Sequence, residues 1–253
     1  AIFIAIIAFF ALILISPAQK AYSDAKATFA QVKVTVDALK KQNIELASQE
    51  LDKTKASLTQ TQKSLDAMGY LKFVPIAGMY YGDAQHLIKA GFYGLDAARV
   101  LIDSLEPYAD LLGLKGKKGS FVAGTASQRI ETAVITMGKI TPHIDDIATH
   151  VEKARKEIDA VDPNHYPPIF GGEKIKKQLL QVQQLVDQGV TFVNNARPLI
   201  KILPSLLGDP KEKKYLVLFQ NDKELRPTGG FITAYAVFRI DKGVIHVDRS
   251  DDI

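Results

Sequence analysis

The residues best suited to chemistry lie in one stretch near the end of the sequence. The candidate ligand-binding residues are two arginines, a threonine, two adjacent glycines and two acidic residues: Asp222, Arg226, Thr228, Gly229, Gly230, Arg249 and Asp251. Arg226 is followed by Pro227, whose ring fixes φ for a turn, and the glycines permit positive φ and close backbone approach. A guanidinium held at such a turn can bind a carboxylate or a phosphate through two parallel hydrogen bonds. The pattern therefore predicts an anion- or ligand-binding turn.

A purely structural role for Arg226 is the alternative that the sequence leaves open. The guanidinium could pair with Glu224, Asp222 or Asp252 and so pin the turn without binding a ligand. The two interpretations differ in what Arg226→Lys does to binding, because lysine keeps the charge but loses the planar fork of donors.

The elements that must position this turn are β-strands. Tyr215–Phe219 is a short apolar run, and Phe231–Ile240 is rich in aromatic and β-branched residues. Asp241-Lys242-Gly243 predicts a hairpin connection to a further strand, Val244–Val247. This is the only part of the sequence with strand character.

The rest of the sequence is typical of helices. From residue 22 to residue 68 it contains neither Gly nor Pro, and apolar residues recur every three or four positions. The apolar stripe slips by one residue at Asn43, which is also a good helix N-cap. The slip favours two helices folded back as a hairpin, with one long coiled-coil rod as the alternative.

Further helices are expected after the glycine-containing stretch Gly69–Gly82. One should end near Leu112 with a kink or stop at Pro107, and it carries a small-residue face for close packing: Gly91, Gly94, Ala97 and Ala98. The others are predicted at Ser127–Lys139, Pro142–Val161 and Glu173–Leu203, the last stopping at Pro204. Gly113–Gly124 is interpreted as a linker.

The helix at Pro142–Val161 carries two specific predictions. Thr141 should be its N-cap, with Pro142 at the first helical position. His143, Asp146 and His150 fall near one face, but their spacing matches no known zinc motif. They are interpreted as surface residues.

Ala1–Ile15 contains no polar residue and ends at Ser16-Pro17. As a helix it covers about 22 Å, short of the roughly 30 Å hydrocarbon core, so we expect a truncated membrane span. A cleaved signal peptide is the alternative. Because there is no initial Met and the last residues follow a strand directly, we interpret the sequence as an internal piece of a longer protein.

Composition excludes several classes of function. Cys is absent, so disulfides, thiolate metal sites and thiol nucleophiles are excluded. The net charge is only +4 and the lysines are spread over the helices, so no nucleic-acid partner is expected.

These patterns predict an α+β protein. It should consist of an N-terminal membrane helix, a mostly antiparallel helical region, and the start of an α/β domain with a β-hairpin sheet, truncated at the C-terminus. The expected domains are a transmembrane anchor at 1–17, a helical hairpin and third helix at 18–112, further helices at 113–207, and the start of a β-containing domain at 208–253.

The segment QNDKELRPTGGF resembles the hallmark of a bacterial domain-of-unknown-function family, number four thousand and twelve in its series. The residues that carry the resemblance are Gln220, Asn221, Glu224, Leu225, Arg226, Pro227, Thr228, Gly229, Gly230 and Phe231. The resemblance implies a membrane-anchored, exported protein whose helical N-terminal region leads into this segment. It implies no particular reaction.

A more distant similarity is to glycopolymer ligases of the LytR-CpsA-Psr type. The matching elements here are the apolar strand ending at Asp222, the Arg226 turn, the strand hairpin, and Arg249 with Asp251. In that family Asp and Arg side chains hold Mg²⁺ and a lipid pyrophosphate. Gly229-Gly230 stands where that family has an Asp, which is a departure from its pattern.

The expected function is therefore that of a single-pass, membrane-anchored, extracytoplasmic envelope protein that acts as a scaffold or binding module. The alternative is a Mg²⁺-dependent phosphotransferase acting on lipid-linked cell-wall glycopolymer. The sequence leaves open whether the protein is an enzyme, and a cofactor, Mg²⁺, is expected only under the alternative. The expected partners are the membrane, through residues 1–15, and a cell-envelope polymer or protein.

Overall fold

The computed structural model describes residues 2–110, 112–116, 125–169, 171–224, 226–227 and 229–253, with side chains from residue 16 onward. These residues form two compact units, which are described separately. The helical unit comprises residues 1–106 and 145–195, and the sheet unit comprises residues 107–144 and 196–253. The domain boundaries expected from the sequence are not tested by this grouping and stay predictions.

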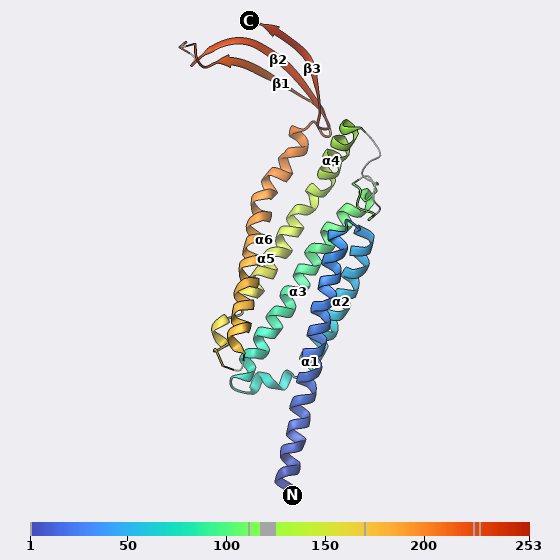
Figure 1. Ribbon diagram of the computed structural model, residues 1–253, viewed down its shortest axis with the longest axis vertical. Helices are drawn as coiled ribbons and strands as arrows, with labels where there is room; N and C mark the ends of the chain where they lie inside the picture. Colours follow the sequence, from blue (N-terminus) through green and yellow to red (C-terminus); the bar gives the residue numbers. More distant parts are fainter. Residues whose placement is uncertain (1, 111, 117–124, 170, 225, 228) are drawn as a thin grey trace. The chain divides into compact units, whose positions relative to one another are not determined.

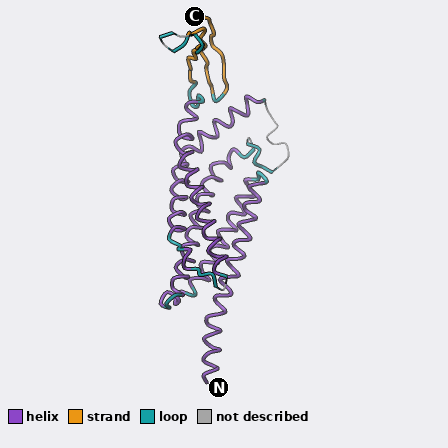
Figure 2. Tube along the Cα trace, turned by 60° about the vertical axis from the view of Figure 1, so that its left-hand side comes forward, coloured by secondary structure: helices purple, strands orange, loops and turns teal. Residues whose placement is uncertain are grey.

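The helical unit is built from long helices lying side by side (Figure 1). Its elements are α1 (Ile2–Lys40), α2 (Ile44–Asp66), the 3-10 helix η1 (Gly69–Phe73), α3 (Ala77–Leu105), α5 (Ile144–Asp159), the 3-10 helix η5 (Pro163–His165) and the first part of α6 (Gly172–Leu206). The first turns of α1 extend past the end of the other helices (Figures 1 and 2).

Helices α1 and α2 form the hairpin and not the rod. The chain reverses after Lys40, and the side chain of Asn43 caps α2 by accepting a hydrogen bond from the backbone N–H of Leu46. Buried hydroxyl pairs join the two helices, with Thr28 bonded to Thr61 at 2.9 Å and Thr35 bonded to Thr54 at 2.8 Å. The slip in the apolar stripe therefore marks the reversal of the chain.

Helix α3 packs on α2 through part of its small-residue face. A Cβ added at Gly91 would lie 3.0 Å from Cδ2 of Leu58, so this glycine allows the close approach. Gly94, by contrast, has open space around it. The predicted stop at Pro107 is confirmed, since α3 ends at Leu105 and not near Leu112. Pro107 lies in the 3-10 helix η2 (Glu106–Tyr108), where its missing N–H costs no α-helical hydrogen bond.

The sheet unit contains α4 (Ala126–Ile140), which begins at a capping box between Thr125 and Gln128, and the 3-10 helix η4 (Thr141–His143). The prediction that Thr141 caps the next helix is wrong. Its hydroxyl instead donates to the carbonyl oxygens of Met137 and Ile200. Ile200 lies four residues before Pro204, and proline has no N–H to satisfy that carbonyl.

The prediction that α6 stops at Pro204 is wrong, and the hydrogen bond from Thr141 explains why the helix continues. The helix continues to Leu206, with Pro198 and Pro204 inside it. A proline within a helix frees a carbonyl one turn earlier, and Thr141 supplies a hydrogen-bond donor for the one freed by Pro204.

The sheet has three antiparallel strands in the order β1 (Lys213–Asn221), β2 (Phe231–Asp241) and β3 (Val244–Asp252). The turn between β2 and β3 has positive φ at Lys242 (45°) and Gly243 (83°), as a two-residue hairpin requires. This turn packs on α4: a Cβ at Gly243 would lie 2.6 Å from Cγ2 of Ile130. The predicted strands and hairpin connection are confirmed, with longer strands than predicted.

The α+β class is therefore confirmed, as a mostly helical chain with a small antiparallel sheet at its C-terminal end. Within the described part of the chain, no helix combines the length and apolar composition needed to cross a membrane. The predicted anchor, Ala1–Ile15, lies outside the residues whose side chains the structure describes. Most of the predicted linker, residues 117–124, lies outside the described residues altogether.

Candidate functional site

The loop between β1 and β2 carries most of the candidate ligand-binding residues. At its start the side chain of Asn221 accepts a hydrogen bond from the N–H of Lys223 (3.2 Å), which turns the chain out of β1. At its end the N–H of Gly229 donates to the carbonyl of Arg226 (2.9 Å), closing a tight turn around Pro227. Thr228 and Leu225 lie outside the described residues.

The two glycines meet two different requirements. Gly229 has φ of +94°, which an L side chain rarely adopts. Gly230 is buried, and a Cβ there would lie 2.6 Å from the carbonyl oxygen of Asn221 and 2.9 Å from Cγ of Gln220. Because Gly230 has no side chain, the loop can pack directly against the end of β1.

Arg226 is exposed, and its guanidinium stacks over the ring of Phe231 with 5.1 Å between the guanidinium carbon and the ring centroid. Within the described residues it forms no ion pair with the predicted acidic partners Asp222, Glu224 and Asp252. An aromatic platform below a planar cation leaves the edge of the guanidinium available to an anion. This contact could not be inferred from charge pairing in the sequence.

Arg249 and Asp251 form an ion pair along β3. The Nε atom of Arg249 donates to Asp251 at 2.8 Å and a terminal nitrogen lies 2.7 Å from the same oxygen. The hydrogen bond that Arg249 donates to Asp251 raises the pKa of Arg249. The guanidinium also lies over the ring of Tyr235, 5.5 Å from its centroid. The two residues are therefore satisfied mainly by each other.

The strand register does not bring Arg226 and Arg249 onto one face of the sheet. Phe231 pairs with Asn221, and Tyr235 pairs with Leu218, with a bulge between the two pairs at Phe219/Gln220. Cross-strand partners share a face, and residues 218 and 221 on the regular strand β1 point to opposite faces. The aromatic platforms of the two arginines consequently lie on opposite sides of the sheet.

A charge network at the other end of the sheet links all three strands. Asp248 on β3 bonds to Lys214 on β1 (3.1 Å) and to Arg239 on β2 (3.1 Å), and Arg239 also reaches Glu212 (3.3 Å). Hydrogen bonds from Lys214 and then Arg239 lower the pKa of Asp248. Asp248 is the extra residue of a second bulge, at Val237/Phe238, so the network favours that bulge.

No cluster of three or more acidic or histidine side chains suited to a metal ion occurs among the described residues. His143 and Asp146 are exposed, as interpreted, whereas His150 is half-buried.

The helical unit contains a polar cluster that the sequence analysis missed. The carboxylate of Asp83 on α3 is only 3 % exposed. Its Oδ2 atom accepts a hydrogen bond from the hydroxyl of Tyr166 (3.1 Å) and lies 3.0 Å from Nδ1 of His165. Burial and then the Asp83 charge raise the pKa of Tyr166, so the phenol stays protonated.

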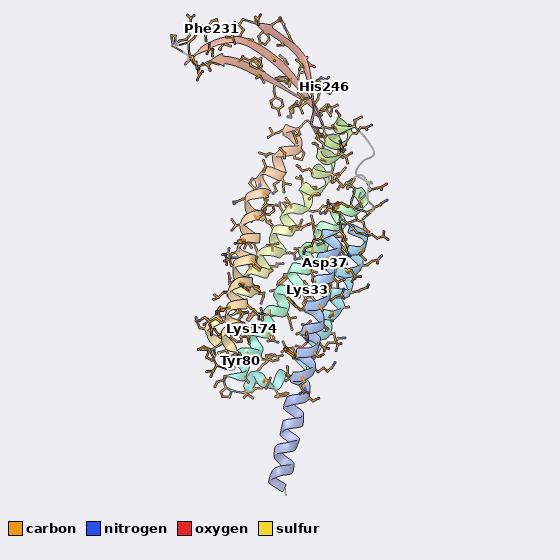
Figure 3. All side chains as sticks on the ribbon, in the orientation of Figure 1. Lys33, Asp37, Tyr80, Lys174, Phe231 and His246 are labelled. Carbon is orange, nitrogen blue, oxygen red and sulfur yellow. The ribbon has the colours of Figure 1, made fainter. Side chains whose placement is uncertain are left out.

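This cluster fastens the 3-10 helix η5 to α3. The hydroxyl of Tyr80 donates to the carbonyl of His165 (2.8 Å), and the Tyr80 and Tyr166 rings lie 5.3 Å apart. Tyr80 lies near the N-terminal end of α3 (Figure 3). The sequence feature that could have revealed this cluster is Asp83, a carboxylate on the apolar side of a helix between Tyr80 and Leu87. The cluster has mutually satisfied partners and is interpreted as structural.

The fold and the site define a helical bundle followed by a three-stranded sheet with a glycine-rich arginine turn. Residues 211–252, which include all three strands, match the family described as "Protein of unknown function (DUF4012)". The match confirms the resemblance that the motif predicted, over the sheet segment. No curated protein and no solved structure matches the chain significantly. The similarity to LytR-CpsA-Psr ligases and the membrane anchor stay predictions.

Proposed function

We propose that this chain is a single-pass, membrane-anchored protein of the bacterial cell envelope, with most of its residues outside the cytoplasm. The helical unit scaffolds the protein close to the bilayer, and the sheet carries a binding module for an envelope polymer or protein. The observation that carries the membrane part is an exposed apolar loop at the end of the bundle where the apolar run of α1 lies.

The loop combines large apolar side chains with high exposure. Phe73 is 88 % exposed and Ile76 is 72 % exposed, while Tyr22 on the neighbouring part of α1 is 74 % exposed. The loop and the start of α1 lie at the same end of the helical unit (Figures 1 and 2). Exposed aromatic and aliphatic side chains beside an apolar helix are typical of a membrane–water interface.

The backbone keeps Ile76 in this exposed position. Ile76 has φ of 69°, and the N–H of Ala77 donates to the carbonyl of Pro75 at 2.8 Å, forming a γ-turn. A β-branched residue at positive φ is a strained choice for a loop in water. Burial of Ile76 in a bilayer interface would offset that strain.

The binding role of the sheet is supported by its surface. Arg226 stacks on Phe231 at the end of β2 that is distant from the β2–β3 turn (Figure 3). Near it on β1, Leu218 and Phe219 are exposed, and as neighbours on a strand they face opposite sides of the sheet. Exposed apolar area next to a stacked cation is suited to a partner that offers both an anion and an apolar surface.

The membrane part can be tested by fractionation. The full chain should stay with membranes after carbonate extraction. Ile7→Lys with Phe10→Lys should release it, because a charge at the centre of a span costs about 2.5–3.5 kcal/mol for insertion. The matched control places the same charges at exposed positions of the same helix, Ala27→Lys with Ala30→Lys, and should leave the protein in the membrane. Extraction of the unchanged chain in intact form would overturn the anchor.

The side of the membrane can be tested with a single introduced thiol, since the chain contains no Cys. Ser250→Cys lies at an exposed position on β3 and should react with a membrane-impermeant maleimide in intact cells. The unchanged chain gives the background. Reaction only after the cells are lysed would place the sheet in the cytoplasm and overturn the extracytoplasmic assignment.

A further inference from the structure

The helical unit contains an apolar cavity of about 440 Å³ near the end of the bundle where the exposed loop lies. Its wall includes residues of α1, α2, η1 and α3: Ala21, Leu65, Met68, Leu71, Ala84 and Ile88. Small-molecule sites commonly measure about 300–1,000 Å³ and are mostly apolar. We infer that this cavity binds a hydrocarbon chain of a membrane lipid, an inference that rests on the membrane anchor proposed above.

Small side chains border the cavity on its α1 and α3 sides. Ala21 and Ala25 of α1 line it, together with Ala84 of α3. The cavity is open on the α1 side, where Ala25 is exposed. Around the cavity the packing is normal, since Leu65, Met68 and Ile88 belong to one buried core cluster.

The polar groups of the wall are few and already engaged. Thr61 donates its hydroxyl to the carbonyl of Ser57 and shares a second hydrogen bond with Thr28. The Tyr80 hydroxyl donates to His165, and the Tyr81 hydroxyl accepts from Gln85. An apolar cavity without available polar partners is a poor site for water and a good one for hydrocarbon.

The position of the cavity favours the hydrocarbon chain of a lipid as its ligand. Ala21 lies six residues after Ile15, the last residue of the apolar run, which is about 9 Å along a helix. Leu71 and Ala77, both in the cavity wall, flank the exposed loop that carries Phe73 and Ile76. The cavity therefore lies within a few helical turns of the proposed bilayer surface, where hydrocarbon chains are the abundant apolar ligand.

The test uses the full chain reconstituted in vesicles of phosphatidylethanolamine and phosphatidylglycerol that contain a palmitic acid with a mid-chain diazirine. After illumination, cross-links should map to peptides from residues 61–71 and 77–88 as well as to the anchor. Ala25→Phe should lower labelling of the former peptides about fifteenfold, if the ring displaces about two methylenes and each weakens apolar binding about fourfold. Ala27→Phe, an exposed alanine of the same helix outside the cavity, should leave it unchanged.

Ala84→Phe provides a second cavity variant on a different helix. Labelling confined to residues 2–15, or equal labelling in Ala25→Phe and Ala27→Phe, would overturn the cavity site. Vesicle flotation of the same samples separates the two proposals. If the unchanged chain does not float, the anchor fails, and the cavity site then stands or falls on whether the fatty acid labels the same peptides in solution without vesicles.

Discussion

Gly208→Ala should destabilise the sheet unit strongly, because this glycine joins α6 to the sheet at a point with no room for a side chain. Gly208 has φ of +82°, and an added Cβ would collide with the carbonyl of Ile240 on β2. The left-handed backbone costs a non-glycine residue about 1–2 kcal/mol. Displacing backbone to relieve the collision costs about 1–3 kcal/mol more, so the expected total is about 2–5 kcal/mol.

Substitutions at two other glycines distinguish the backbone cost of positive φ from the cost of the collision. Gly171 has φ of +86° with nothing within 4 Å of its would-be Cβ, so Gly171→Ala should cost only the backbone term, about 1–2 kcal/mol. Gly94, inside α3, also has open space, so Gly94→Ala should stabilise its helix by up to about 1 kcal/mol. Both lie in the helical unit.

The assay is urea unfolding of each variant, combined with hydrogen exchange of the β2 and β3 amides to report on the sheet unit alone. The two amides of the β2–β3 turn should lose protection first in Gly208→Ala, because Lys242 donates to Gly208 and Gly243 donates to Leu207 in the native structure. A cost for Gly208→Ala no larger than that for Gly171→Ala would refute the collision argument.

Three further outcomes are expected. Arg226→Ala should cost about 0.5–1 kcal/mol and Arg226→Lys less, because the arginine is exposed and stacks on Phe231; a loss of 3 kcal/mol or more in urea unfolding would instead indicate a buried ion pair. Thr54→Val should cost about 1 kcal/mol, because it removes the hydrogen bond to Thr35 and leaves the Thr35 hydroxyl only its longer bond to the carbonyl of Gln31 (3.3 Å); a double-mutant cycle with Thr35→Val should show coupling, and strict additivity would contradict it. Asp248 has a folded pKa below its ordinary 3.8, so its contribution is present above about pH 4 and lost as pH falls through the folded pKa. Asp248→Asn should remove that acid-dependent part of sheet unfolding, measured by hydrogen exchange, and an unchanged acid limb would exclude Asp248 as its source.

Local patterns in the sequence predicted the elements that local physics determines. The aromatic and β-branched residues of β2 and the Asp241-Lys242-Gly243 turn identified a hairpin, because strand preference and turn chemistry act over a few residues. The slip at Asn43 identified the α1–α2 reversal for the same reason, since a cap and a stripe are both local.

Two of the failures involve partners that are distant in sequence. Thr141 resembles an N-cap, but its hydroxyl is used by the carbonyl of Ile200, 59 residues away. Asp83 meets His165 across 82 residues, and neither residue alone indicates the other. For the candidate site, the glycine-rich turn was predictable, whereas the stacking of Arg226 on Phe231 depends on where the loop returns to the sheet.

The bulge between Phe219 and Gln220 determines on which faces of the sheet the two arginines lie. Thr233 is the extra residue on β2, and its hydroxyl donates to the carbonyl of Phe219 at 3.2 Å. Inserting one residue into β1 opposite Thr233 would restore simple alternation along β2, so Phe231 and Tyr235, which are four residues apart, would lie on the same face of the sheet and no longer on opposite faces. One additional residue in β1 would therefore convert a sheet with one arginine on each face into a sheet with both arginines on the same face.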